Sequence, residues 1–317
     1  MFRRGDYRYR PRVLAAFLTT IFWAGSIVCA WRSARLIGAT EANFWRLALS
    51  AGLLAIWANT AGHGLFGEAF PLFLLSGLIG IGLGDTVWFQ ALARLGSRLT
   101  TLLTNCFTPP FAALIEWLWL GTTLRTSQLV CGGVILTGVS LALAPGAHLK
   151  ITRRKVVFGV AACAIAALAG AVGAVLSRKG VAVADAAGQP LDGGTAAFQR
   201  QLGGLVVAAV WLLLVRHREI KAHLAGTGPD TRVGVRKWKT VWPWVAANGI
   251  LGQTLGVSFY QVALGQLPAG IVLSIAALTP LTVIPLARIV EGERPTRRSL
   301  IGTVIAVAGV IGLALQR

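Results

Sequence analysis

The sequence predicts an all-α membrane protein with ten transmembrane helices, arranged as two inverted five-helix repeats. Three observations predict this fold class. First, the 317 residues are 55% hydrophobic and only 13% charged, whereas a soluble domain carries about a quarter charged residues. Second, apolar runs of about 20 residues, the length that crosses roughly 30 Å of hydrocarbon, recur along the chain. Third, similar residues recur in the same order in the two halves of the sequence.

Ten apolar runs define the expected transmembrane helices. They are continuous, whereas a β-barrel would need alternating segments of about ten residues. The first run follows five arginines, as in a signal peptide, but it is too long for a signal core and a second run follows almost at once. The expected spans are 13–31, 42–59, 70–93, 98–120, 126–144, 156–177, 195–215, 241–264, 268–290 and 297–315.

The charge and motif content exclude several function classes. The formal net charge is +19, but Lys and Arg fall mostly between apolar runs, where they hold loops against lipid headgroups. We therefore expect a lipid bilayer and not nucleic acid as the partner of these charges. The four cysteines lie inside apolar runs without a CxxC pair, and the four histidines are scattered, so we expect neither a disulfide nor a metal site. No ATPase or hydrolase motif is present, and we expect neither a cofactor nor an enzyme.

An internal repeat divides the chain into expected domains at residues 1–147 and 148–317. Thr108-Pro109 matches Thr279-Pro280 at a shift of 171 residues, and Phe44 and Arg46 match Phe198 and Arg200 at a shift of 154. At a shift of 172, Gly77, Gly80, Leu83, Gly84, Ala91, Leu92 and Leu95 match Gly249, Gly252, Leu255, Gly256, Ala263, Leu264 and Leu267.

Because each copy holds an odd number of helices, the second copy enters the membrane from the opposite side. Inverted repeats are typical of carriers whose substrate site lies at the membrane midplane between the halves. Both chain ends then lie on one side. The Lys and Arg content of the loops and the basic N-terminal segment favour opposite orientations, so the sequence leaves that side open.

Asp85 is the strongest candidate for a functional residue. It lies about 15 residues into the third expected span, where an isolated carboxylate is costly and usually functional. Two functional interpretations are open: a proton-binding coupling site or a contact to a substrate amine. The structural alternative is an ion pair with Arg46, whose depth differs from that of Asp85 by only about one helical turn.

Two other charged residues have favoured structural interpretations. Arg200 corresponds to Arg46, but Val257 stands in the place of Asp85 in the second copy. Arg200 either meets an anionic substrate group or extends to the lipid headgroups, and its position near a helix end favours the latter. Glu116 lies beside Trp117 and Trp119, and tryptophan is enriched at membrane interfaces, so we expect a solvated acid at an interfacial anchor.

Polar and aromatic residues at the depth of Asp85 complete the predicted site. The Thr-Pro pairs remove backbone donors and are expected to interrupt their helices, and the freed carbonyls are tolerated where they line a cavity. Trp88 lies one turn beyond Asp85 and corresponds to Tyr260. The predicted substrate- or proton-binding residues are Asp85, Trp88, Arg46, Asn105, Thr108, Arg200, Tyr260 and Thr279, and Gln90, Gln253, Ser258 and Gln261 are expected to add hydrogen bonds.

In these features the chain resembles the drug/metabolite transporter superfamily, specifically the ten-helix EamA-type carriers. Two departures bear on the substrate more than on the fold: Thr122 stands where the family usually has Glu, and no aromatic residue stands near Gly170. The motifs that carry the resemblance are Trp23-Ala24-Gly25-Ser26, Phe44-Trp45-Arg46, Gly84-Asp85-Thr86, Ala91-Leu92, the two Thr-Pro pairs and Gly292-Glu293.

The resemblance implies a secondary carrier in a bacterial inner membrane that exports amino acids, other metabolites or drugs by alternating access, with proton coupling as one option. Two alternatives stay open. One is a carrier of nucleotide- or lipid-linked sugars, and the other is a membrane scaffold that transports nothing. The expected partners are a small-molecule substrate and the bilayer, and the chain is expected to be a monomer or a homodimer.

Overall fold

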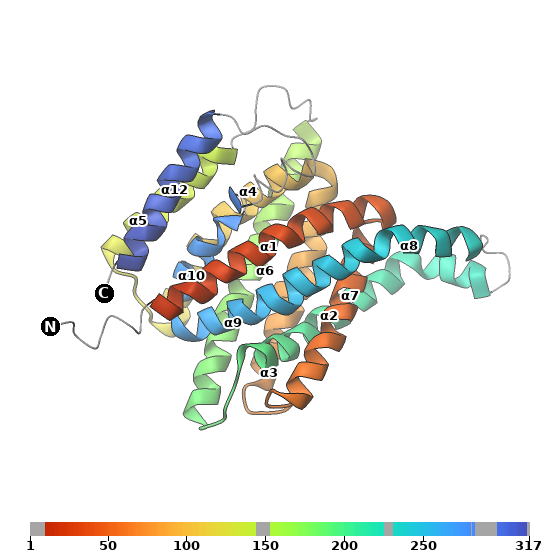
Figure 1. Ribbon diagram of the computed structural model, residues 1–317, viewed down its shortest axis with the longest axis horizontal. Helices are drawn as coiled ribbons and strands as arrows, with labels where there is room; N and C mark the ends of the chain where they lie inside the picture. Colours follow the sequence, from red (N-terminus) through yellow and green to blue (C-terminus); the bar gives the residue numbers. More distant parts are fainter. Residues whose placement is uncertain (1–9, 144–152, 225–230, 280, 283–296, 316–317) are drawn as a thin grey trace.

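The computed structural model describes residues 10–143, 153–224, 231–279, 281–282 and 297–315, and every regular element in these ranges is a helix (Figure 1). The expected all-α class is confirmed. The first half contains α1 (Arg10–Ile37), α2 (Ala39–Thr60), α3 (Phe70–Ser76), the π-helix η1 (Gly77–Leu83), α4 (Gly84–Leu120) and α5 (Thr126–Leu143). The second half contains α6 (Arg153–Ala186), α7 (Gly193–Leu224), α8 (Thr231–Asn248), the π-helix η2 (Gly249–Gly256), α9 (Val257–Gln266), α10 (Ala269–Ala276) and α12 (Arg297–Leu315).

The two π-helices repeat the sequence match between the halves. Gly77, the first residue of η1, corresponds to Gly249, the first residue of η2, at the shift of 172 residues. Each π-helix packs against the first two long helices of the other half: η1 against α6 and α7, and η2 against α1 and α2. This exchange of corresponding partners is the arrangement that a pseudo-twofold duplication produces.

Glycine permits the closest of these contacts. A Cβ atom on Gly77 would collide with the backbone carbonyl oxygen of Arg200, and one on Gly249 would approach that of Arg46 to 3.0 Å. Arg46 and Arg200 are themselves corresponding residues. The same backbone approach therefore seats each arginine-bearing helix against the π-helix of the opposite half.

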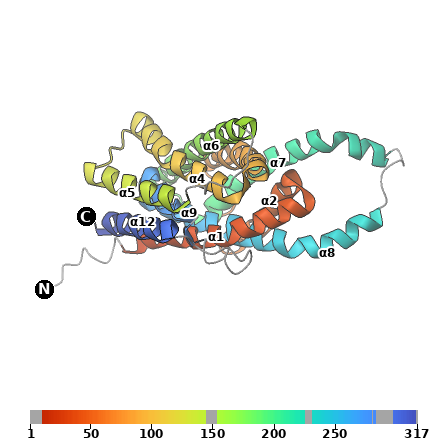
Figure 2. The same ribbon diagram turned by 90° about the horizontal axis from the view of Figure 1, so that it is seen from above.

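The remaining helices surround the two π-helices and the helices that contact them. α5 and α12 lie side by side at one end, whereas α7 and α8 extend beyond the other helices at the opposite end (Figures 1 and 2). The largest buried apolar cluster joins α4, α6, α9 and α10 through residues such as Ala112, Leu264 and Ile275. This apolar core thus joins helices of both halves.

The helices differ most from the expected spans between the third and fourth of these spans. The sequence predicts a turn at Arg94 to Arg98, yet helical hydrogen bonding continues through α4 from Gly84 to Leu120. Asp85 and Thr108 nevertheless line one cavity, although a straight helix would separate them by about 35 Å. α4 therefore bends back between them, and the two predicted helices are the two arms of one bent helix.

The Thr-Pro pairs have different effects in the two halves. α4 continues through Pro109 and Pro110, so the expected interruption is wrong there. In the second half α10 ends at Ala276, and Ala277 and Leu278 form a turn before Thr279, which agrees with an interruption. Pro280, Pro285 and the Gly292-Glu293 pair lie outside the described residues.

Within the described ranges, four helices are long and apolar enough to cross a membrane: Val13–Ile37, Phe70–Leu92, Val156–Ala186 and Gly193–His217. The other expected spans remain predictions. α8 shows one reason for the difference, because its first half carries several basic residues and its apolar part continues into η2 and α9.

Candidate functional site: a cavity between the two halves

A cavity of about 210 Å³ lies between the halves. Its wall is formed by α1, α2, η1 and α4 of the first half and by α6, α7, η2, α9 and α10 of the second. Space of this size holds on the order of ten water molecules. The structure brings all eight residues predicted for the site to this wall, namely Arg46, Asp85, Trp88, Asn105, Thr108, Arg200, Tyr260 and Thr279.

The ion pair between Arg46 and Asp85, which the sequence offered as the structural alternative, is present. Arg46 Nη2 lies 2.5 Å from Asp85 Oδ2, and Arg46 also donates to Asn43 Oδ1 from Nε (3.0 Å) and Nη2 (2.8 Å). The guanidinium carbon lies 4.9 Å from the centre of the Phe89 ring. The Arg46 side chain is 7% exposed, but that of Asp85 is 27% exposed, so the pair is buried on the arginine side and open to the cavity on the acid side.

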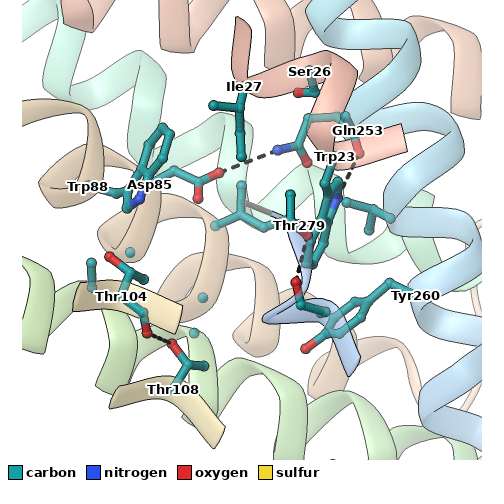
Figure 3. Close-up of a pocket in the computed structure, with 18 of the residues that line it drawn as sticks. Trp23, Ser26, Ile27, Asp85, Trp88, Thr104, Thr108, Gln253, Tyr260 and Thr279 are labelled. Atoms are coloured by element: carbon teal, nitrogen blue, oxygen red, sulfur yellow. Dashed lines mark hydrogen bonds between the residues drawn. The ribbon is translucent and has the colours of Figure 1, made fainter. Parts of the chain in front are cut away.

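Gln253 extends this pair across the cavity. Its Nε2 lies 3.4 Å from Asp85 Oδ2, and the two side chains face each other in Figure 3. The Gln253 Oε1 atom is buried without a hydrogen-bond partner among the described residues. The second half therefore places an unsatisfied acceptor beside the acid of the first half.

Arg200 points into the protein interior and does not extend to the lipid headgroups, so the favoured expectation for this residue is wrong. It is 5% exposed, and its guanidinium carbon lies 5.4 Å from the centre of the Tyr260 ring. The reason is its depth: α7 begins at Gly193, two residues earlier than expected. Arg200 is consequently about two turns inside the helix, too far from its end for the side chain to reach water along the helix surface.

Aromatic side chains form one wall of the cavity. The Trp23 and Tyr260 rings lie 5.2 Å apart, and Trp23 Nε1 donates to the Gly252 carbonyl oxygen at 3.2 Å (Figure 3). Trp88 lies near Asp85 on the other side of the space (Figure 3). Because α1 carries Trp23 whereas α9 carries Tyr260, this wall also joins the two halves.

The threonine hydroxyls donate to their own backbones. Thr108 Oγ1 lies 2.7 Å from the Thr104 carbonyl oxygen, and Thr279 Oγ1 lies 2.6 Å from that of Ala276. Their oxygens are left as acceptors toward the cavity. The Asn105 side chain is half-buried and makes no hydrogen bond to the part of the chain that the structure describes, which leaves its amide available to a bound molecule.

Glu116 is buried, and the expectation of a solvated interfacial acid is wrong. It is 1% exposed, its Oε1 lies 2.7 Å from Arg178 Nε, and its Oε2 accepts the Ala269 N–H at 2.9 Å. Glu116 stands four and eight residues after the buried Ala112 and Thr108, so it shares their face of α4. That spacing was the signal in the sequence, and it outweighs the neighbouring tryptophans.

The contribution of α1 was missed from the sequence. Trp23, Ser26, Ile27 and Ala30 line the cavity, and Ser26 Oγ lies 2.6 Å from Asn248 Oδ1 of the second half. These four residues follow the three- and four-residue spacing of one helical face, but none is charged. Trp23 and Ser26 belong to a motif that carries the family resemblance, but nothing in the sequence assigned the four residues to the site.

The comparisons with known proteins agree with this architecture. One solved protein crystal structure is similar over 96% of this chain and 97% of the other chain, with a TM-score of 0.71 and 18% sequence identity. This likeness shows the fold alone. No curated protein matches the chain. The sequence model of the EamA-like transporter family matches residues 10–144 and 157–315. The chain therefore belongs to the EamA-like transporter family and is a multi-pass membrane protein of a family that transports small molecules.

Proposed function

We propose that this protein is a secondary transporter of small metabolites, amino acids or drugs, and that the cavity between the halves is its substrate site. The observation that carries the proposal is that both halves build the wall of one cavity and each contributes an arginine to it from the corresponding position, Arg46 and Arg200. Rocking of one half against the other around such a site is how inverted-repeat carriers alternate their access. A scaffold that transports nothing has no use for a cavity of this kind.

The size of the cavity supports a small substrate. Its volume of about 210 Å³ lies below the roughly 300–1,000 Å³ of pockets that enclose drug-sized molecules. Nucleotide-linked and lipid-linked sugars are at least as large as drug-sized ligands. We therefore favour small metabolites and amino acids over drugs and over these sugars as substrates. Export across a bacterial inner membrane is the proposed direction.

Asp85 is the coupling group in this proposal. Its carboxylate is shared between Arg46 and the cavity. A proton that reaches the carboxylate from the cavity removes its charge and releases Arg46, and the contact between α2 and α4 is weakened as a result. This change gives a proton gradient a means of altering how the helices pack.

Cysteine labelling tests alternating access without knowledge of the substrate. The four native cysteines (Cys29, Cys106, Cys131 and Cys163) are replaced by alanine, and single cysteines are introduced at Ala166, which lines the cavity, or at its neighbour Ala167, which is buried but does not. We expect a membrane-impermeant thiol reagent to label Ala166→Cys in both right-side-out and inside-out vesicles. Ala167→Cys is the control and should stay unlabelled.

The pair Ala276 and Ala277 repeats the test in the second half, because only Ala276 lines the cavity. Labelling of Ala166→Cys and Ala276→Cys from one membrane side only, or from neither, would contradict alternating access and favour a scaffold.

A further inference from the structure

We infer that the cavity binds a small organic anion, with a carboxylate group of the substrate seated on the guanidinium of Arg200. This inference rests on the proposed function, because it names the class of molecule that the cavity carries.

The protein makes specific room for the Arg200 side chain. A Cβ atom added to Gly80 would lie 2.8 Å from Arg200 Nη2, and one added to Gly173 would lie 3.1 Å from the same atom. The two glycines come from η1 and α6, in opposite halves. Their missing side chains provide the space that the guanidinium occupies, so the position of the cation is built into the fold.

Arg200 has no acidic partner among the described residues. Its counterpart Arg46 forms an ion pair with Asp85, but the position that corresponds to Asp85 in the second half is Val257, which also lines the cavity. Asp85 attracts Arg200 only at longer range. Arg200 Nε is buried without a hydrogen-bond partner in the described ranges. The contacts of the guanidinium with the Tyr260 ring and with the Tyr260 hydroxyl compensate only part of the cost of burying a cation.

The cavity is therefore short of one negative charge. The charged residues on its described wall are Arg46, Asp85 and Arg200, which leave a net charge of +1. A bound monoanion restores neutrality, whereas a phosphate ester with about two negative charges would exceed it. A carboxylate also matches the planar fork of an arginine, which donates two parallel hydrogen bonds to it.

The neighbouring polar atoms indicate what the rest of the anion carries. Gln253 Oε1 is a buried acceptor without a partner among the described residues, on a side chain that lines the cavity beside Asp85 (Figure 3). If the side chain turns this oxygen toward the cavity, an anion with a hydroxyl or N–H group beside its carboxylate can satisfy it while the carboxylate binds Arg200. Hydroxy acids and N-acyl amino acids have this chemistry.

The test uses the full-length protein in lipid nanodiscs and compares each acid with its own amide. The probes are lactate with lactamide, propionate with propionamide, benzoate with benzamide, and N-acetylglycine with its amide, and the readout is the thermal unfolding midpoint Tm as a function of probe concentration. We expect at least one acid to give a saturable rise in Tm that its neutral amide does not give. Equal shifts by acids and amides, or no shift by any acid, would overturn the inference.

Variants then place the binding at Arg200. Arg200→Gln is expected to weaken the binding of the acid by roughly 10- to 100-fold, because a charge-assisted hydrogen bond is lost. Arg94→Gln, which removes one positive charge from an exposed position of α4, is the matched control and should bind as the wild type does. Equal weakening by both variants would mean that the acid responds to overall charge and not to this site.

Val257→Asp gives the most specific variant, because it supplies the acid that the second half lacks. The new carboxylate is expected to occupy Arg200 and abolish the response to acids, whereas Val257→Asn, of similar size but uncharged, should weaken the response less. Retained acid binding in Val257→Asp would contradict the inference, as would an equal loss of binding in both variants. The acid-binding and cysteine-labelling experiments can fail separately. Two-sided labelling without acid binding supports the transporter and refutes the anion site. Acid binding with one-sided labelling supports the anion site and refutes alternating access.

Discussion

At the scale of single residues, the ion pair between Arg46 and Asp85 has the clearest energetic consequence. Arg46 is 5% exposed, and removal of one partner of a buried ion pair costs about 3–5 kcal/mol. We expect Arg46→Gln to lower the stability of the protein by this order of magnitude, measured as unfolding in detergent. The exchange Arg46→Asp with Asp85→Arg restores opposite charges and should recover part of the loss. An exchange no more stable than the single variants would show that the pair does not act as a unit.

A second residue-scale prediction separates the structural and transport roles of Asp85. Asp85→Asn keeps the shape of the side chain and can still accept a hydrogen bond from Arg46, but it cannot bind and release a proton. We expect this variant to insert into the membrane and to lose or uncouple transport. The measurement is flux in proteoliposomes with and without a proton gradient, and the amount of folded protein by size-exclusion chromatography is the control. Wild-type, gradient-dependent flux would exclude the coupling role.

The sequence predicted the residues on the cavity wall better than it predicted the partners of the charges. The ion pair of Asp85 with Arg46 could be named as an alternative because both residues lie at similar depth in adjacent spans. Glu116 was misjudged because it was judged by its neighbouring tryptophans, and Arg200 because it was judged by its distance from a helix end. Their burial depends on residues far along the chain, Arg178 for Glu116 and the glycines of η1 and α6 for Arg200, which local sequence does not identify.

At the scale of helices, the π-helices should tolerate side chains poorly where they meet the other half. We expect Gly77→Ala to destabilise the protein by about 1–3 kcal/mol, the usual cost of overpacking, because its Cβ meets the Arg200 backbone. Gly249→Ala should have a smaller effect, since its nearest contact is 3.0 Å. Gly52→Ala is the control: it meets nothing within 4 Å and should stabilise α2 by about 0.5–1 kcal/mol. Equal Tm values for Gly77→Ala and Gly52→Ala would refute the close approach.

Glu116 links three helices. It lies on α4 and contacts Arg178 of α6 and the first backbone amide of α10. Glu116→Gln retains an acceptor for the amide but loses the ion pair. We expect a loss of about 2 kcal/mol, typical of a hydrogen bond to a charged group, measured by thermal unfolding. Arg178→Gln should cost about as much, and the double variant should cost no more than either single variant. Additive losses would mean that the two residues do not act through each other.

The helix content was predictable from apolar runs, but the continuity and character of the helices were not. The basic segment between the two arms of α4 has the composition of a loop, yet its backbone stays helical. The glycines of η1 and η2 were recognised as a repeat. Their π-helical hydrogen bonding was not, because it depends on the packing of these segments against the opposite half.

At the scale of the whole molecule, the segment after α2 and the segment before α7 contact each other and join the halves. Asp192 precedes α7 and accepts hydrogen bonds from the backbone amides of Gly194 and Thr195, the Thr195 hydroxyl and Trp57 Nε1 of α2. Thr195 Oγ1 in turn accepts the His63 N–H. The acid thus caps its own helix and also holds the first half against the second.

This contact predicts a dependence of stability on pH. Burial by itself raises the pKa of Asp192, but the hydrogen bonds from Thr195, Trp57 and the backbone outweigh it and hold the pKa below its ordinary value of 3.8. The stabilisation is therefore complete above about pH 4 and is lost as the pH falls through the lowered value in the folded protein. We expect Asp192→Ser, which can still cap the helix, to lower Tm at neutral pH. The difference from the wild type should shrink in acid, and a constant difference from pH 7 to pH 3 would refute this.

The two π-helices determine how the helical segments that follow them are rotated. The amide of Gly84 reaches the carbonyl of Ile79, and that of Val257 reaches Gly252, five residues back in each case. Each segment thus accommodates one residue more than a regular helical turn. Deleting that residue would leave the helix intact but rotate everything after it by about 100°. Asp85 and Tyr260 would then point away from the cavity. One extra residue in each π-helix therefore determines which side chains face the space between the halves.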